Sequence, residues 1–253
     1  LGGEADDTII TERPFRSPHH TASFISLVGG GSKPVPGEIS LAHNGVLFLD
    51  EIPEYPRMSL EALRQPLEDR TISVSRSAGK VRYPANFMLI ATKNPCPCGY
   101  YGDPNRECTC TMTQLLAYQK RVSGPLMDRI DLIVHVNRAS EEDFLFEQSP
   151  TDPLSDKWRS LVESARQRQH NRHNKPLSNA QLNGKQLAKL SRLSKGAEQL
   201  LQKASASMKL SARSYFKVIR VARTIADLDG SDDILLDHVA EALQYRGESA
   251  TSS

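Results

Sequence analysis

Two patterns of hydrophobic and polar positions divide the chain. Up to about residue 137, short continuous apolar runs alternate with stretches in which apolar residues recur at helical spacing. Continuous runs are typical of strands buried in a parallel sheet, and the helical spacing predicts the helices between them. After residue 137 only the helical spacing occurs. We therefore predict an α/β domain over residues 1–137 and a smaller all-α domain over residues 138–253.

Three apolar runs predict the strands of a parallel sheet buried on both faces. They cover Gly45 to Asp50, Phe87 to Thr92 and Leu132 to Val136. Apolar residues at helical spacing predict a helix from Pro56 to Glu68, with a kink near the proline close to its end. Alternating residues on both sides of a short turn predict a β-hairpin over Thr71 to Tyr83.

Six stretches of the second domain predict helices, and a polar, proline-containing stretch over residues 149–153 predicts a linker. The expected helices run from Glu141 to Phe146, Ser155 to His173, Asn183 to Ser191, Lys195 to Ala206, Ala212 to Leu228 and Leu236 to Tyr245.

The distribution of charge adds to this picture more than the composition does. The formal net charge is only +2, yet residues 157–223 hold sixteen basic and two acidic side chains, a net charge of +14. From residue 224 onward, seven acidic side chains face one basic side chain. The basic block suggests a surface that binds a polyanion, or alternatively a set of solvated helix faces.

Nothing in the sequence points to a membrane or to secretion. No apolar run approaches the ~20 residues of a membrane span, and the start of the chain lacks the basic and then apolar pattern of a signal peptide. We therefore expect a cytoplasmic protein that has no membrane partner.

Two adjacent carboxylates end the first apolar strand. Asp50 and Glu51 directly follow Leu49, and ligands of open α/β sheets bind at the carboxyl ends of the strands. The first carboxylate can hold Mg²⁺ against nucleotide phosphates, and the second can polarise an attacking water. The alternative is a strand end that carries two solvated acids.

All four cysteines lie close together in the sequence. They form two C-x-C pairs on either side of a loop rich in Gly, Pro and Asn, which can fold one pair onto the other: Cys96, Cys98, Cys108 and Cys110. Four thiolates suit tetrahedral Zn²⁺, so we predict a structural zinc site. Reduced thiols and a redox pair are the alternatives.

These motifs together resemble the Mg-chelatase-like AAA+ ATPases of the ComM/YifB family. The strand that ends in Asp50 and Glu51 resembles a Walker B motif, and Asn94 after the next strand resembles sensor 1. The nine residues from Arg13 to Thr21 read R-P-F-R-S-P-H-H-T, which resembles a signature of this family. The resemblance runs from there to Arg246, nearly the whole chain.

The resemblance implies a role for each candidate site residue. Asp50 would hold Mg²⁺, Glu51 would be the catalytic base, and Asn94 would orient the attacking water. Arg129, in the segment Ser123 to Leu132, resembles the arginine finger that reaches the γ-phosphate on a neighbouring subunit. Arg213 resembles sensor 2, the lid arginine that contacts the nucleotide.

Alternatives remain open for several of these residues. Asn94 before a proline is also a routine turn residue. Arg129 can instead pair with Asp128 or Asp131, and Arg121 is a second candidate finger. The role of the paired histidines in the family signature, His19 and His20, does not follow from sequence, and structural hydrogen bonding is the default expectation; metal ligation and DNA contact are the alternatives.

The resemblance also implies a fold and a function. We expect an incomplete AAA+ P-loop-type sheet with a β-hairpin insertion, followed by a helical lid, in a hexameric ring that binds ATP and Mg²⁺. The expected function is ATP-driven DNA remodelling of the branch-migration type, in natural transformation or recombination. Alternatives are a motor subunit that inserts Mg²⁺ into a porphyrin, and a zinc-stabilised DNA-binding or assembly module without hydrolysis.

The sequence departs from the family at the phosphate-binding loop. The Walker A pattern G-x-x-x-x-G-K-[ST] does not occur, because the lysine of the run Gly29 to Lys33 follows a serine and precedes a proline. We expect this run to form a mobile loop that faces a ring pore or a partner. We also expect an exposed sheet edge where a strand is missing, and a chain that by itself binds ATP weakly and does not hydrolyse it.

Overall fold

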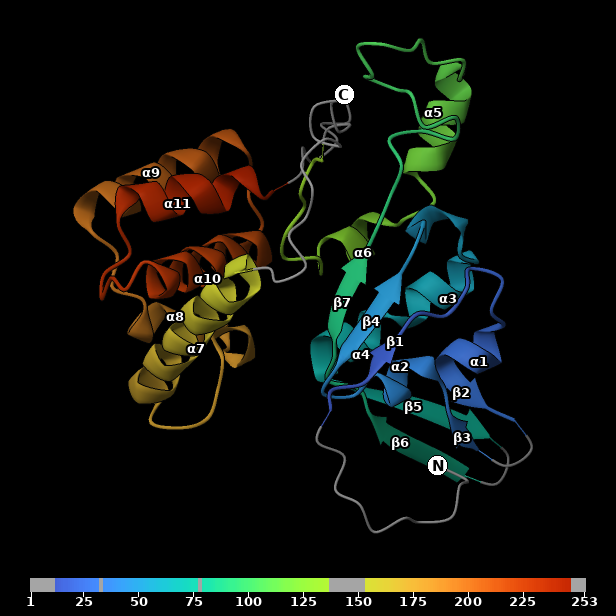
Figure 1. The fold of residues 1–253 in the computed structure, drawn as a ribbon, viewed down its shortest axis with the longest axis horizontal. Coiled ribbons are helices and arrows are strands. Elements are labelled where there is room, and N and C mark those ends of the chain that lie inside the picture. Colours follow the sequence, from blue (N-terminus) through green and yellow to red (C-terminus); the bar gives the residue numbers. More distant parts are fainter. Residues whose placement is uncertain (1–11, 32–33, 77–78, 137–152, 247–253) are drawn as a thin grey trace. The chain divides into compact units, whose positions relative to one another are not determined.

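The computed structural model describes residues 12–31, 34–76, 79–136 and 153–246 (Figure 1). The chain divides into two compact units, Leu1–Arg129 and Ile130–Ser253. The first unit is α/β with a parallel sheet and the second is helical, so the predicted fold class is confirmed. The predicted boundary after residue 137 falls where the undescribed residues 137–152 begin, so it stays a prediction. The predicted helix at residues 141–146 and the linker also lie outside the described residues.

The first unit is built on a three-stranded parallel sheet with the strand order β1-β4-β7. These strands are β1 (Phe15–Arg16), β4 (Val46–Leu49) and β7 (Met88–Ala91). A glycine permits the close approach of the first two strands, because a Cβ added at Gly45 would lie 1.9 Å from the carbonyl oxygen of Pro14. Because the three strands are parallel, their carboxyl ends all meet at one edge of the sheet.

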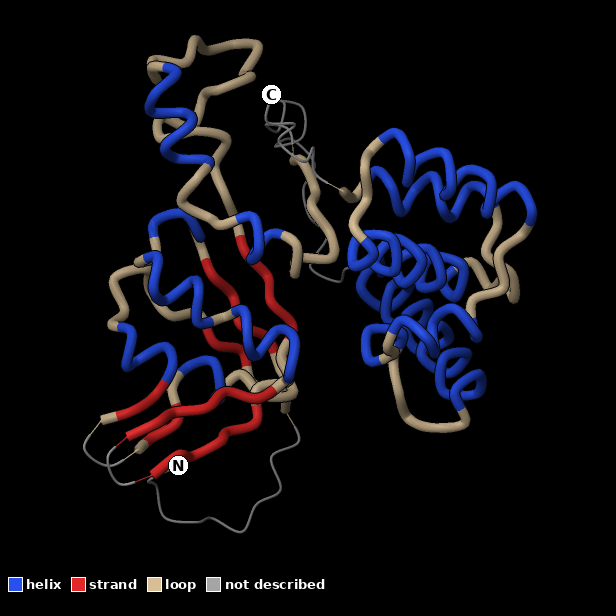
Figure 2. Tube along the Cα trace, turned by 180° about the vertical axis from the view of Figure 1, so that it is seen from behind, coloured by secondary structure: helices blue, strands red, loops and turns tan. Residues whose placement is uncertain are grey.

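Only one face of this sheet is fully buried. Leu47 and Leu49 have no exposed surface and pack in the core with residues of the helices that follow them. On the opposite face Phe48 is half-buried, whereas Met88 and Ile90 are 56% and 43% exposed. The prediction that the strand over residues 87–92 is buried on both faces is therefore wrong, since no described element of this unit covers its second face (Figures 1 and 2).

The third predicted strand does not form in the described structure. Leu132, Val134 and Val136 are 50%, 63% and 87% exposed, and their segment is neither strand nor helix. A strand needs a neighbour to satisfy its backbone groups, and here Ile133 donates instead to the carbonyl oxygen of Tyr245 at 2.8 Å. At the sheet edge, β7 pairs with β4 alone among the described strands, in line with the expected incomplete sheet.

The predicted helix over residues 56–68 is interrupted. It consists of α3 (Arg57–Ala62) and α4 (Arg64–Asp69). Pro66 has no N–H to donate to the carbonyl oxygen of Ala62. The break consequently falls one turn before the proline and not at it.

The predicted β-hairpin is confirmed. It pairs β5 (Thr71–Arg76) with β6 (Gly79–Pro84) in antiparallel register. The glycine run that we expected to be a loop begins in a second, shorter pairing of β2 (Gly29–Gly30) with β3 (Val35–Pro36). An added Cβ at Gly29 would lie 2.5 Å from the Val35 carbonyl oxygen, so only glycine allows this pairing. Residues 32 and 33 are not described.

Several short elements complete the first unit. They are α1 (Phe24–Val28), α2 (Glu38–Leu41), the 3-10 turn η1 (Ile52–Glu54), α5 (Met112–Gln119) and α6 (Gly124–Met127). Helix α5 has no counterpart in the sequence prediction. Its signal is the capping box at its start, in which the side chains of Thr111 and Gln114 satisfy each other's backbone N–H groups.

The second unit is a helical bundle whose helices begin and end close to the predicted positions. They are α7 (Pro153–His173), α8 (Gly184–Leu190), α9 (Lys195–Ser207), α10 (Ala212–Leu228) and α11 (Leu236–Gln244), with a 3-10 turn η3 (Asn179–Gln181). Helix α10 packs against α7, α8 and α11 (Figure 1). No described helix combines the length and the apolar character that crossing a membrane requires.

A buried ionic network joins α10 to α7. The carboxylate of Asp227 has no exposed surface and accepts hydrogen bonds from Arg172, Arg223 and Asn179. Arg223 is 1% exposed and also donates to the carbonyl oxygens of two residues in the turn after α10. The Arg223 guanidinium thus ties the end of α10 to the turn that follows it.

Candidate nucleotide-binding edge and cysteine cluster

The two acids that follow β4 lie at the carboxyl edge of the sheet. Glu51 adopts a left-handed backbone conformation, with φ 49° and ψ 55°, immediately before η1. A residue with a Cβ pays about 1–2 kcal/mol to adopt this conformation. The chain turns sharply here, and such strain persists only where neighbouring groups hold it in place.

Thr92, the first residue after β7, holds both acids. Its hydroxyl donates to Oδ1 of Asp50 at 2.5 Å and accepts from the backbone N–H of Glu51 at 2.9 Å. Its carbonyl oxygen accepts from the N–H of Ile52 at 2.9 Å. Our sequence interpretation did not single out Thr92, although a hydroxyl residue directly after an apolar strand at this edge was the available signal.

Asn94 reaches the same group of side chains from the loop after β7. Its Nδ2 donates to Oε1 of Glu51 at 3.1 Å. The structure therefore brings together three of the predicted site residues, Asp50, Glu51 and Asn94. All three side chains are accessible at the surface of the first unit.

The family signature also ends at this edge, because β1 is parallel to β4. The hydroxyl of Tyr55 donates to the carbonyl oxygen of Pro18 at 2.5 Å, and the ring of His20 packs edge-on against Tyr55. Burial, together with the negative charge of Asp50, raises the pKa of Tyr55. His19 bonds through Nδ1 to the Thr21 hydroxyl at 2.8 Å, which agrees with the structural role expected by default.

The Arg129 side chain is held by residues of its own chain. Its guanidinium donates to Glu68 at 2.5 Å, to the carbonyl oxygen of Pro125 at 2.6 Å and to that of Arg64 at 3.1 Å. Its side chain is 13% exposed. The local partner is thus Glu68, and neither of the two aspartates that we had considered.

The second candidate finger, Arg121, is more accessible. Its guanidinium pairs with Glu54 at 2.7 Å and its side chain is 50% exposed. Arg213 lies in the first turn of α10, where the hydroxyl of Ser211 accepts from the N–H of Ser214 as the predicted N-cap. Arg213 belongs to the second unit and is described only within it.

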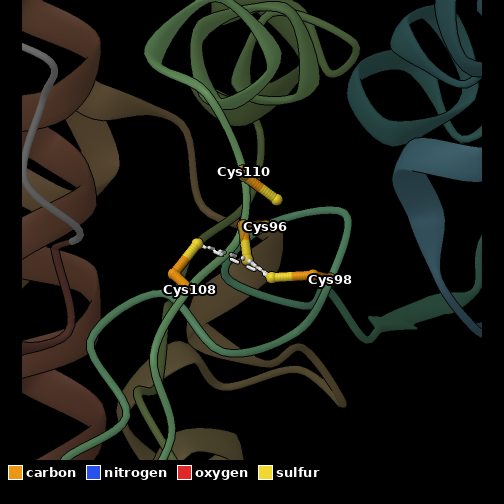
Figure 3. A group of neighbouring side chains, drawn as sticks. All are labelled: Cys96, Cys98, Cys108 and Cys110. Atoms are coloured by element: carbon orange, nitrogen blue, oxygen red, sulfur yellow. Dashed lines mark hydrogen bonds between the residues drawn. The ribbon is translucent and has the colours of Figure 1, made fainter.

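The four cysteines converge in the loop between β7 and α5 (Figure 3). Their sulfur atoms all lie within 4.8 Å of one another. The sulfur of Cys96 lies 3.3 Å from that of Cys98 and 3.7 Å from that of Cys108, and the last two are 3.6 Å apart. Zn–S bonds of about 2.3 Å in a tetrahedron separate the sulfurs by about 3.8 Å, so the spacing fits a zinc ion.

The electrostatics of the cluster fit a bound cation as well. Hydrogen bonding from the backbone of Tyr100, with help from the neighbouring thiols, lowers the pKa of Cys98 to about 5. Burial and the other three sulfur atoms raise the pKa of Cys110 to about 12. Four thiolates at this spacing repel one another, and a divalent cation would remove that repulsion.

Not all sixteen basic side chains of residues 157–223 are exposed. Lys217 and Arg223 are buried, and Arg172 and Arg220 are half-buried. The remaining twelve basic side chains are exposed: Lys157, Arg159, Arg166, Arg168, Lys175, Lys185, Lys189, Arg192, Lys195, Lys203, Lys209 and Arg213. We call this set the basic surface.

Comparison with known proteins identifies the family. Residues 1–144 match the family model "Magnesium chelatase, subunit ChlI", and residues 153–246 match that of its C-terminal part. The chain belongs to this magnesium-chelatase-like family, and its first unit is an AAA+-like core followed by the helical part.

The similar proteins include the two types that the motifs resemble. The chain is 44% identical over 236 residues to the uncharacterized protein YifB of Escherichia coli, covering 93% of this chain and 46% of that protein. It is 45% identical over 236 residues to the competence protein ComM of Haemophilus influenzae, covering 93% of this chain and 45% of that protein. The uncharacterized protein Rv2897c of Mycobacterium tuberculosis is 40% identical over 243 residues, with coverages of 95% and 48%. The chain thus spans about half the length of these relatives.

Proposed function

We propose that the intact protein containing this chain is a ring-forming ATPase that remodels DNA in natural transformation or recombination. The observation that carries the ATPase part is the joint placement of Asp50, Glu51 and Asn94 at one edge of a parallel sheet. Ligands bind at this edge in open α/β sheets. Membership of a family related to AAA+ ATPases supports the same conclusion.

Each residue of this edge would have a distinct role. Asp50 would hold the Mg²⁺ that accompanies the phosphates of ATP, since carboxylate oxygens suit this ion. Glu51 would polarise the attacking water, and Asn94, bonded to Glu51 at 3.1 Å, would orient it. Phosphoryl transfer of this kind needs no covalent intermediate with the protein. It depends on the positioning of the water and the phosphates and on stabilisation of their charge.

Two arginines would complete the site. Arg129 would reach the γ-phosphate bound to a neighbouring subunit, after it exchanges Glu68 for that phosphate. Arg213 would contact the nucleotide from the lid. An arginine that acts in this way requires a ring, and we propose a hexamer.

DNA is the proposed substrate. One relative of this chain is the competence protein ComM, which is in line with a DNA substrate. The basic surface supports this assignment because lysine and arginine neutralise phosphates and release counterions. We place the protein in the cytoplasm, where such a substrate is met.

The four cysteines would hold a structural Zn²⁺, as their sulfur spacing supports. The 253-residue sequence lacks a Walker A pattern, so the amides and lysine that cradle the β- and γ-phosphates are absent from it. We therefore propose that the chain by itself binds ATP weakly and does not hydrolyse it. Mg²⁺-dependent turnover by the isolated chain that is lost in Glu51→Gln would contradict this.

Two other functions are tested by the same assays. A porphyrin-metallating motor would hydrolyse ATP with no response to DNA, and the cysteine cluster and the histidine-containing signature argue for the ComM/YifB type instead. A non-hydrolysing, zinc-stabilised module would bind DNA without turnover. ATP turnover and salt-dependent DNA binding by the intact protein separate the three possibilities.

A further inference from the structure

The cysteine cluster is attached directly to the loop that carries Asn94. Cys96 lies two residues after Asn94, and only Pro95 separates them. The Cys96 side chain is fully buried, and its sulfur also accepts from the backbone N–H of Tyr101 at 3.3 Å. The segment from the end of β7 to Cys96 is therefore very short, and the cluster fixes its second end.

The second half of the cluster leads back to the same place. Cys110 precedes Thr111, which caps α5, and the side chain of Tyr118 on this helix is buried. Arg121, just after α5, lies over the Tyr118 ring and donates to Glu54 at 2.7 Å. Burial and the charges of Glu54 and Glu51 raise the pKa of Tyr118, and a hydrogen bond with the backbone of Asn94 acts in the opposite direction. The loop that carries Asn94 is thus held at Cys96, and the helix that follows the cluster is tied to the turn after Glu51.

We propose that a zinc ion bound by the four cysteines acts as a clip that holds Asn94 against Glu51, so that metal occupancy controls ATP hydrolysis. This inference rests on the proposed ATPase function. It assigns the cluster a purpose beyond general stability.

The physical basis is the closure of the loop between β7 and α5. A metal clip removes the entropy of an open loop, and it does so only when its ligands are deprotonated and bound. Without the ion, only weak thiol contacts of 3.6 and 3.7 Å join Cys108 to the first cysteine pair. The loop that carries Asn94 is then no longer held at Cys96. Asp50 and Glu51 stay in place, because Thr92 still bonds to the Asp50 carboxylate and to the Glu51 backbone.

The test uses the intact protein and measures four quantities. They are the zinc content per chain, the affinity for a non-hydrolysable ATP analogue, the rate of ATP turnover and the amide hydrogen exchange of residues 92–98. We expect about one zinc per chain in protein purified under reducing conditions. Removal of zinc by a chelator should lower turnover about 100-fold, as expected when a reacting group is misplaced by about 1 Å.

The same treatment should change the affinity for the analogue by less than about twofold and should raise exchange at residues 92–98. Added zinc should restore both turnover and protection. Cys110→Ser should lower turnover and raise exchange at residues 92–98 in the same way, with no chelator added. Tyr118→Phe should keep its zinc and lower turnover, whereas the matched control Tyr83→Phe, whose hydroxyl bonds to Pro34 in another part of the unit, should change neither.

Three results would overturn the inference. The first is an intact, reduced protein without stoichiometric zinc. The second is zinc loss that leaves turnover and the exchange of residues 92–98 unchanged. The third is zinc loss that unfolds the protein as a whole, seen as exchange rising equally in β4. If the zinc-loaded protein shows no turnover at all, the proposed ATPase function fails instead, and the exchange measurement still tests the clip.

Discussion

The hydroxyl of Thr92 lies 2.5 Å from a carboxylate oxygen of Asp50 and bridges it to the backbone of Glu51. One side chain at the end of β7 thus orders both acids at the end of β4. The bridge is the most specific feature of the candidate site, because it joins two adjacent strands at the point where a metal and a water would meet.

Thr92→Val removes this bridge and preserves the shape and the β-propensity of the side chain. A hydrogen bond to a charged group contributes about 1.5–3 kcal/mol, so we expect turnover by the intact protein to fall about tenfold or more. The Mg²⁺ concentration for half-maximal turnover should rise, because Asp50 is no longer oriented. Steady-state turnover measured across a Mg²⁺ titration checks both effects.

The matched control is Thr92→Ser, which retains the hydroxyl. It should stay within about threefold of the wild type in both quantities, since the same hydrogen bonds can form. Equal losses in the valine and serine variants would show that the methyl group, and not the bridge, matters at this position.

Arg129→Ala tests the proposed finger. Loss of an arginine that stabilises the transferred phosphoryl group lowers turnover about 10³-fold or more, and ATP binding should be retained. If the proposed finger acts on a neighbouring subunit, mixing Arg129→Ala with Glu51→Gln protein should recover part of the turnover. Mixed rings contain interfaces with an intact acid on one side and an intact arginine on the other.

Glu68→Gln separates this role from a structural one. Glu68 holds the Arg129 guanidinium at 2.5 Å on its own subunit, so a weaker hold should not reduce turnover if Arg129 is a finger. A loss of turnover in Glu68→Gln as large as in Arg129→Ala, with no recovery on mixing, would identify the pair as a structural ion pair.

Asp227→Ala should destabilise the helical unit. It leaves Arg223, 1% exposed, without its carboxylate partner, and the loss of one partner of a buried pair costs about 3–5 kcal/mol. Urea unfolding of the 253-residue chain, followed by circular dichroism, measures this. Asp232→Asn is the control, because its carboxylate is 90% exposed and lies 3.8 Å from Arg168, and no measurable change is expected.

Replacing Lys185 and Lys189 with glutamine tests the basic surface. Both side chains are exposed on α8. If each contacts a phosphate, the slope of log K against log salt should decrease in magnitude by about 0.9 per lysine. Lys120→Gln, an exposed lysine outside the basic surface, should leave the slope unchanged. A slope that is the same in all three proteins would show that α8 does not contact DNA.

The helical unit was largely predictable because its signals are local. The starts of α9 and α10 follow from serine N-caps, and their course follows from apolar spacing; a single stretch of sequence contains both signals. The strand expected at Leu132 to Val136 was not predictable from its own pattern. A strand depends on a partner far away in the chain, and Ile133 bonds instead to Tyr245.

The candidate site shows the same division. Asp50, Glu51 and Asn94 were recognisable because each follows an apolar run that ends at one sheet edge. Thr92 was missed, since its role depends on the register that sets Leu49 opposite Ala91. The partner of Arg129 was also missed, because Glu68 comes close only when the chain folds back.

The most direct measurement is ATP turnover by the intact protein, with and without branched DNA, beside the Glu51→Gln variant. The account predicts turnover that branched DNA stimulates and that the variant lacks, while the variant still binds ATP. Turnover that no DNA changes would contradict the DNA-remodelling function. Turnover that persists in Glu51→Gln would contradict the assignment of the site itself.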